Sequence, residues 1–190
     1  AALAEVARGS EADATDWQSL ASFFGATLRP GEQCAVAAEG LERFPESDAL
    51  RAVYAAGAHW VGAPGTLAQT YIELAERHPD SAASSWYAGW ALVNHAEWQR
   101  RGERPGLALM LYAPAERWFM GAKQREPAFA DTSDHYLAMC KLGSGFAHLL
   151  LDERAEAAHE LEQAIQIRPD LDGVRDGLDR EPLDLIDGAL

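Results

Sequence analysis

Small and apolar residues recur at the same offsets in two distant parts of the chain. In AERWFMGAKQREP, Ala115, Phe119 and Ala122 are spaced by four and three residues, and Pro127 follows five residues later. The stretch AAHELEQAIQIRP, which ends at Pro169, keeps the same offsets. Such spacing puts side chains on one face of an α-helix, and proline stops a helix because it lacks the amide hydrogen. The pattern predicts repeated amphipathic helices and a period along the chain.

Prolines close the predicted helices and set that period. The first interval between them, from Pro45 to Pro79, is 34 residues, and the next two are 48 and 42 residues. We therefore expect helix hairpins of about 34 residues, of which the third and fourth are enlarged, the fourth through a longer first helix. Their approximate ranges are 14–47, 48–81, 82–129 and 130–171.

The first hairpin resembles the tetratricopeptide repeat (TPR) family. The residues that fit the pattern of the family's first helix are Trp17, Leu20, Ala21 and Phe24. In the second helix Gln33 stands where the family prefers Ala, and Ala37 replaces an aromatic residue. The resemblance extends over residues 14–169. It implies an all-α fold, a right-handed α-solenoid of about four TPR-like hairpins over residues 1–170, with an acidic C-terminal cap or tail at 171–190.

The third hairpin contains a longer connection, residues 99–114, that turns apolar at LALMLY. We expect this stretch either to extend both helices or to fold back over the groove, because a long structureless loop is uncommon in a compact domain. The hairpin also has a faint similarity to the T-component of bacterial TRAP transporters, a periplasmic repeat lipoprotein. That similarity implies a small organic or hydrophobic ligand, or a periplasmic partner protein.

In the TPR family the first helix of each hairpin lines a concave groove. Carrying those positions over gives a candidate binding groove rich in aromatic residues, which suit binding surfaces. The predicted groove residues are His59, Trp60, Trp86, Trp90, Asn94, His135 and Lys141. For Trp86 and Trp90 the sequence leaves a groove position and a core position open.

Composition narrows the classes of partner. The chain has 30 acidic and 16 basic residues and a formal net charge of −14, which disfavours nucleic acid. No apolar run is long enough to predict a membrane span. The two cysteines have no metal-type spacing, and buried thiols are expected. The sequence begins without Met, so both a cytoplasmic location and a periplasmic one after removal of a leader stay open.

No motif for catalysis, metal binding or a cofactor emerges from the chain. It has no phosphate-binding glycine loop, nucleophile elbow or HExxH motif, and Gly143 and Gly145 are expected to allow close helix packing. The sequence therefore predicts a non-enzymatic interaction module that binds a basic or amphipathic protein segment in its groove. The alternatives are a carrier of a small apolar ligand and, third, an enzyme on a helical scaffold, and self-association is left open.

Overall fold

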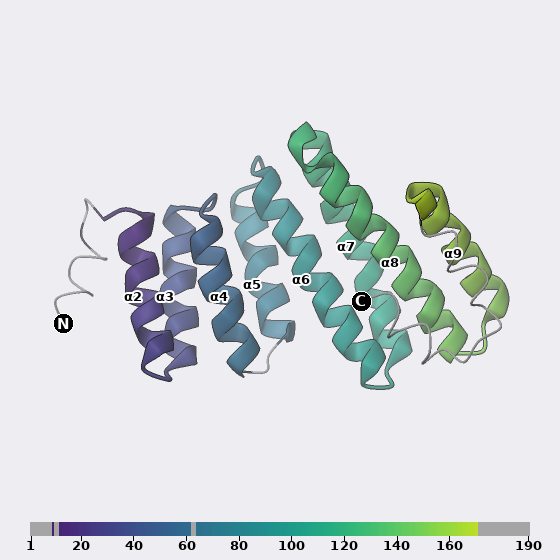
Figure 1. Ribbon diagram of the computed structural model, residues 1–190, viewed down its shortest axis with the longest axis horizontal. Coiled ribbons are helices and arrows are strands. Elements are labelled where there is room, and N and C mark those ends of the chain that lie inside the picture. Colours follow the sequence, from purple (N-terminus) through teal and green to yellow (C-terminus); the bar gives the residue numbers. More distant parts are fainter. Residues whose placement is uncertain (1–8, 10–11, 62–63, 171–190) are drawn as a thin grey trace. The chain divides into compact units, whose positions relative to one another are not determined.

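The computed structural model describes residue 9 and residues 12–61 and 64–170. Within these ranges the chain forms α-helices and a short 3-10 helix, with no strand, so it is all-α as predicted (Figure 1). In chain order the elements are α2 (Ala14–Ala26), α3 (Pro30–Arg43), α4 (Asp48–Val61), α5 (Pro64–Arg77), α6 (Ala82–Arg101), α7 (Pro105–Arg125), η1 (Pro127–Phe129), α8 (Ala130–Leu150) and α9 (Arg154–Ile167). Each predicted hairpin range contains two of the α-helices, and η1 lies at the end of the third range.

Every second helix ends two residues before the proline that was expected to close it. The proline ring disfavours helical geometry in the residue directly before it. The last helical residue is therefore the one before that, two positions ahead of the proline. The four pairs of last helical residue and proline are Arg43 and Pro45, Arg77 and Pro79, Arg125 and Pro127, and Ile167 and Pro169. The predicted helix ends are confirmed.

Proline also begins three of the helices. Pro30, Pro64 and Pro105 are the first residues of α3, α5 and α7, and a glycine follows each. Proline suits this position because the amide hydrogen it lacks would have no partner inside the helix. The recurring Pro-Gly pair is a further repeated feature of the chain, and it was not among the features used to predict the repeat from the sequence.

The turns inside three hairpins share one backbone conformation. Leu28, Glu103 and Asp152 have φ angles of 57°, 58° and 59°, and each stands between the two helices of a hairpin. This left-handed conformation is costly for residues with a Cβ atom. In all three turns the left-handed position is thus occupied by a residue other than glycine.

The stretch 99–114 extends both helices of the third hairpin and does not form a separate loop. α6 continues to Arg101, a short turn follows, and α7 begins at Pro105. Pro114 lies inside α7. Of the two expected outcomes, helix extension is confirmed.

The contacts divide the chain into two compact units, residues 1–84 and 85–190, with the division in the first turn of α6. In the first unit α2 packs on α3, and both contact α4. Trp17, Leu41 and Tyr71 are buried in its core. Gly40 lets α3 approach closely, because a Cβ atom there would lie 3.0 Å from atoms of Trp17 and Leu50.

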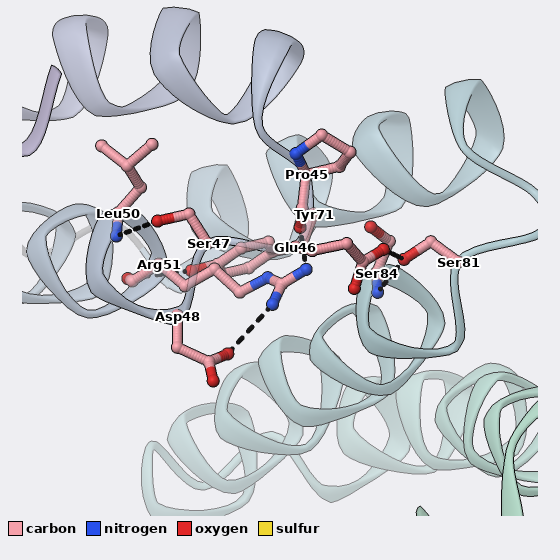
Figure 2. A network of polar contacts seen from close by, with 9 residues as sticks. All are labelled: Pro45, Glu46, Ser47, Asp48, Leu50, Arg51, Tyr71, Ser81 and Ser84. Carbon is pink, nitrogen blue, oxygen red and sulfur yellow. Dashed lines mark hydrogen bonds and ion pairs between the residues drawn. The ribbon is translucent and has the colours of Figure 1, made fainter. Parts of the chain in front are cut away.

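Arg51 on α4 is the largest fully buried side chain of the first unit (Figure 2). Its guanidinium donates to the backbone carbonyl of Pro45, and its Nη1 lies 3.1 Å from a carboxylate oxygen of Asp48. Tyr71 on α5 donates a 3.1 Å hydrogen bond to the backbone carbonyl of Arg51. Arg51 therefore links the end of the first hairpin to the start of α4 and, through its own carbonyl, to α5.

In the second unit three glycines mark the helix crossings. A Cβ atom on Gly89 of α6 would lie 2.9 Å from the Phe119 ring of α7. One on Gly143 of α8 would lie 2.5 Å from the Tyr112 ring of α7, and one on Gly145 would lie 2.8 Å from Leu161 of α9. The close packing expected of Gly143 and Gly145 is confirmed.

Candidate binding site

The second unit contains a cavity of about 360 Å³ between α6 and α8. From α6 the lining residues are Trp90, Val93, Asn94, Glu97 and Arg100. From α8 they are His135, Tyr136, Met139, Leu142, Gly143 and Phe146. On both helices these residues follow one another at helical spacing, so each helix presents one face to the cavity.

Packing from α7 supports the aromatic wall of the cavity. The ring of Tyr136 stacks on that of Phe119, with centroids 5.3 Å apart and planes 19° apart. Trp86 meets both rings edge-on, at 5.2 Å from Tyr136 and 5.9 Å from Phe119. Because these rings pack on one another and Phe119 is fully buried, the Tyr136 side of the cavity is held in place.

The polar groups inside the cavity are already paired with one another. The carboxylate of Glu97 accepts hydrogen bonds from the buried guanidinium of Arg100 and from the Tyr112 hydroxyl of α7. The Arg100 guanidinium also lies 5.7 Å from the centroid of the Phe146 ring. This network offers a ligand a neutral surface, because the two opposite charges neutralise each other.

The pKa shifts of Tyr112 and Arg100 agree with their pairing to Glu97. Burial raises the pKa of the Tyr112 hydroxyl well above its usual value, and the charge of Glu97 raises it further. Burial alone would lower the pKa of Arg100, but the hydrogen bond and charge of Glu97 outweigh burial and raise it. At neutral pH the network holds an ionised arginine and a protonated tyrosine.

Three of the predicted groove residues meet at this cavity. Trp90 and Asn94 lie one helical turn apart on α6, and His135 lies across from them on α8. The Asn94 side chain is exposed and donates a 2.8 Å hydrogen bond to the Trp90 carbonyl of its own helix. His135 is exposed as well. These two side chains supply polar groups at the accessible part of the site.

Trp86 and Lys141 lie elsewhere in the second unit. Trp86 is half-buried in the aromatic cluster with Phe119 and Tyr136, so the core position that the sequence left open for it describes its packing better. Lys141 is turned toward α7 and α9, where its ammonium lies 3.1 Å from Glu116 and 3.2 Å from Glu160. Lys141 therefore does not line this cavity, and the extra turns of α8 left its register open in the sequence.

His59 and Trp60 belong to α4 in the first unit, and their side chains lie outside the described part of the structure. The first unit has its own hollow of about 450 Å³, lined by residues that include Ser22, Leu28 and Ala56. Gln33 also lines this hollow, and its side chain donates a 2.8 Å hydrogen bond to the Val53 carbonyl.

The residues of the deeper part of the cavity were not predicted from the sequence. Tyr136, Met139, Gly143 and Phe146 are spaced by three, four and three residues, which marks one face of α8. That spacing could have been found once the helix was known to start at Ala130. The pairing of Glu97 with Arg100 could not, because i, i+3 charge pairs are common on exposed helix faces.

Groups that could carry other chemistry are separated or already engaged. Cys140 is buried, and burial raises the pKa of its thiol. His95 contacts the Gln99 side chain at 2.8 Å, and burial followed by the charge of Arg104 lowers its pKa. Among the described residues, no three or more His, Cys, Asp or Glu side chains are grouped as metal ligands would be.

The helices in the described ranges include none that combines the length and apolar character of a membrane span. Comparison with protein-family models, with curated proteins and with solved structures found no match for this chain.

Proposed function

We propose that this protein is a non-enzymatic interaction module whose cavity between α6 and α8 holds an apolar side chain of an amphipathic partner segment. The observation that carries the proposal is the cavity itself, with aromatic and aliphatic walls and polar groups that satisfy one another. An apolar side chain entering it would lose water without leaving a buried charge unpaired. Asn94 and His135 are available to hydrogen-bond the partner's backbone at the rim.

We further propose that the hairpins follow the TPR pattern and stack as a right-handed α-solenoid. The turn conformation shared by three of the hairpins and the Pro-Gly start shared by α3, α5 and α7 support this arrangement. In such a solenoid the first helix of each hairpin faces the concave surface. α6 and α8 are the first helices of the third and fourth hairpins, so the cavity would lie in the groove.

Two features of this protein indicate which charge the partner segment carries and where. The net charge of −14 favours approach of a basic segment through long-range attraction. The cavity itself has no free carboxylate to bind a cation, because Glu97 is paired with Arg100. We therefore expect an amphipathic segment whose apolar residue enters the cavity while its basic residues stay in solvent.

Selection of binding peptides from a random library against the full chain tests this proposal. Trp90→Ala is expected to weaken the selected peptides at least about tenfold, as loss of a central aromatic contact does. Trp98→Ala is the matched control, since Trp98 is on the same helix, is 49% exposed and does not line the cavity. The proposal would be contradicted if Trp90→Ala and Trp98→Ala weakened peptide binding equally, or if neither weakened it.

A carrier of a small apolar ligand is the second candidate. Its support is the volume of the cavity, about 360 Å³, which lies within the range of small-molecule sites. The stretch 99–114 does not add to that support, because it lengthens α6 and α7 and leaves Met110 exposed. Native mass spectrometry of the purified chain separates the two: a bound small molecule that Trp90→Ala releases would favour the carrier.

A further inference from the structure

The outward face of α7 is unusually apolar for an exposed helix. Leu107, Met110 and Met120 have exposed fractions of 47%, 72% and 48%. Ala113 and Arg117 lie on the same side at helical spacing and are also exposed. We call these five residues the α7 outer face. The opposite side of the helix, with Tyr112 and Phe119, is buried against the rest of the unit.

α7 is also a basic helix in an acidic protein. It carries Arg117, Lys123 and Arg125, and its one acidic residue, Glu116, is paired with Lys141 of α8. Lys123 is paired with Asp134 of α8, so Arg117 and Arg125 are the charges beside the exposed apolar strip. Such a strip would attract a segment that combines leucines with carboxylates. Exposed patches of this kind mark interaction sites.

The same chain contains such a segment at residues 171–190, which lie outside the described ranges. Its sequence, LDGVRDGLDREPLDLIDGAL, has six acidic and two basic residues. Its large apolar residues include Leu178, Leu183, Leu185 and Ile186. Its charge is opposite to that of α7, and its apolar residues match the exposed strip in kind.

The described chain stops close to one end of α7. Arg168 pairs with Asp170 at 2.9 Å, and the pKa of Arg168 is raised by that hydrogen-bonded pair first and then by the nearby charges of Asp131 and Asp134. Asp134 in turn forms an ion pair with Lys123 in the last turn of α7. Residue 171 therefore follows a point beside the C-terminal end of α7.

The segment is long enough to reach the whole face. The 21 residues of α7 span about 32 Å at 1.5 Å per residue. Twenty residues can extend over roughly 66 Å, so residues 171–190 could run back along α7 as far as Leu107. The length, the negative charge and the apolar residues of segment 171–190 are all compatible with binding to the α7 outer face.

We propose that residues 171–190 bind the α7 outer face of their own chain, with leucine and isoleucine side chains on Met110 and its neighbours and carboxylates toward Arg117. From the sequence alone this segment was expected to be an acidic C-terminal cap or tail. The α7 outer face is a different site, and it does not involve the cavity between α6 and α8. The proposal therefore stands apart from the proposed function.

Thiol labelling of the full-length chain tests this inference. In a Cys34→Ser background Cys140 stays buried, and Ala113→Cys places a reporter on the α7 outer face without removing a large apolar side chain. Ala35→Cys on α3 is the matched control, an exposed alanine in the middle of another helix. We expect Ala113→Cys to react about tenfold more slowly than the control, because the bound segment shields it most of the time.

A second set of variants tests whether residues 171–190 protect the cysteine at position 113. Replacing Leu183, Leu185 and Ile186 together by Asp should raise the Ala113→Cys rate to that of Ala35→Cys and leave the control unchanged. The proposal would be overturned if Ala113→Cys and Ala35→Cys reacted with the thiol reagent at equal rates in chains whose residues 171–190 are unaltered. It would also be overturned by protection that disappears on dilution together with a halving of the measured mass, because the occupant would then come from a second copy.

Discussion

Tyr112 on α7 donates a hydrogen bond to Glu97 on α6, and its ring lies against Gly143 on α8. One side chain thus connects three helices of the second unit beside the cavity. Tyr112 is fully buried, and it comes from the stretch 99–114 that the sequence marks as extra. The added turns of the third hairpin therefore help to build the candidate site.

Tyr112→Phe tests the polar part of this connection. The variant keeps the ring but removes a donor from Glu97, so we expect the free energy of unfolding to fall by about 1–2 kcal/mol. Chemical denaturation of the full chain measures this change. A variant as stable as the wild type would show that the Tyr112 hydroxyl contributes nothing to the network.

Gly143→Ala tests the steric part. A Cβ atom at this position would lie 2.5 Å from the buried Tyr112 ring, so we expect a loss of about 2–3 kcal/mol in stability. Gly106→Ala in α7 is the control, because its Cβ atom would meet nothing within 4 Å. That change should leave stability equal or raise it by up to about 1 kcal/mol. Equal effects of both changes would contradict the close crossing of α7 and α8.

Lys141→Met tests the ion pairs among α7, α8 and α9. Removal of the ammonium leaves Glu116 and Glu160 near each other, and we expect a loss of about 1–3 kcal/mol at pH 8. Lys123→Met is the control, since Lys123 and Asp134 are more exposed and should contribute less than about 1 kcal/mol.

The loss in Lys141→Met should depend on pH. Burial raises the pKa of Glu116 even though Lys141 lowers it, so without Lys141 the folded-state pKa rises further. A carboxyl with a raised folded-state pKa binds its proton more tightly in the folded state, so the variant gains stability as pH falls through that pKa. Denaturation at pH 8 and pH 5 should show the smaller deficit at pH 5. A deficit that grows toward pH 5 would contradict this account.

Leu28→Gly tests the shared turn. Leu28 has a φ angle of 57° and is 87% exposed, so glycine removes strain and little packing. Leu28→Ala removes the same side chain but keeps the strained backbone. We expect Leu28→Gly to be more stable than Leu28→Ala by about 1 kcal/mol in thermal denaturation. Equal stability would mean that the turn imposes no strain.

The all-α class and the ends of the helices were predictable because their signals are local. Prolines two residues beyond the helix ends and small residues at the crossings act within a single turn or hairpin. Pro45 and Gly145 could therefore be interpreted from the sequence alone. The exact register of α8 could not, since a helix lengthened by two turns satisfies the same spacing in more than one way. Lys141, which was predicted for the groove, does not line the cavity.

The candidate site was predictable only in part. Trp90, Asn94 and His135 follow from the position of the first helices in each hairpin. The pairing of Arg100 with Glu97 depends on burial by α7 and α8, which no single helix reveals. That pairing changes the expected partner, because it removes the negative charge that would otherwise bind a basic side chain inside the cavity.

Chemical-shift mapping of the isotope-labelled full chain with a selected peptide locates the bound segment without a prior choice of site. We expect the largest amide shifts on α6 and α8, around Trp90, Asn94, His135 and Met139, and we expect them to vanish in Trp90→Ala. Shifts confined to α2–α5 or to α7, with those residues unchanged, would contradict the assignment of the cavity as the binding site.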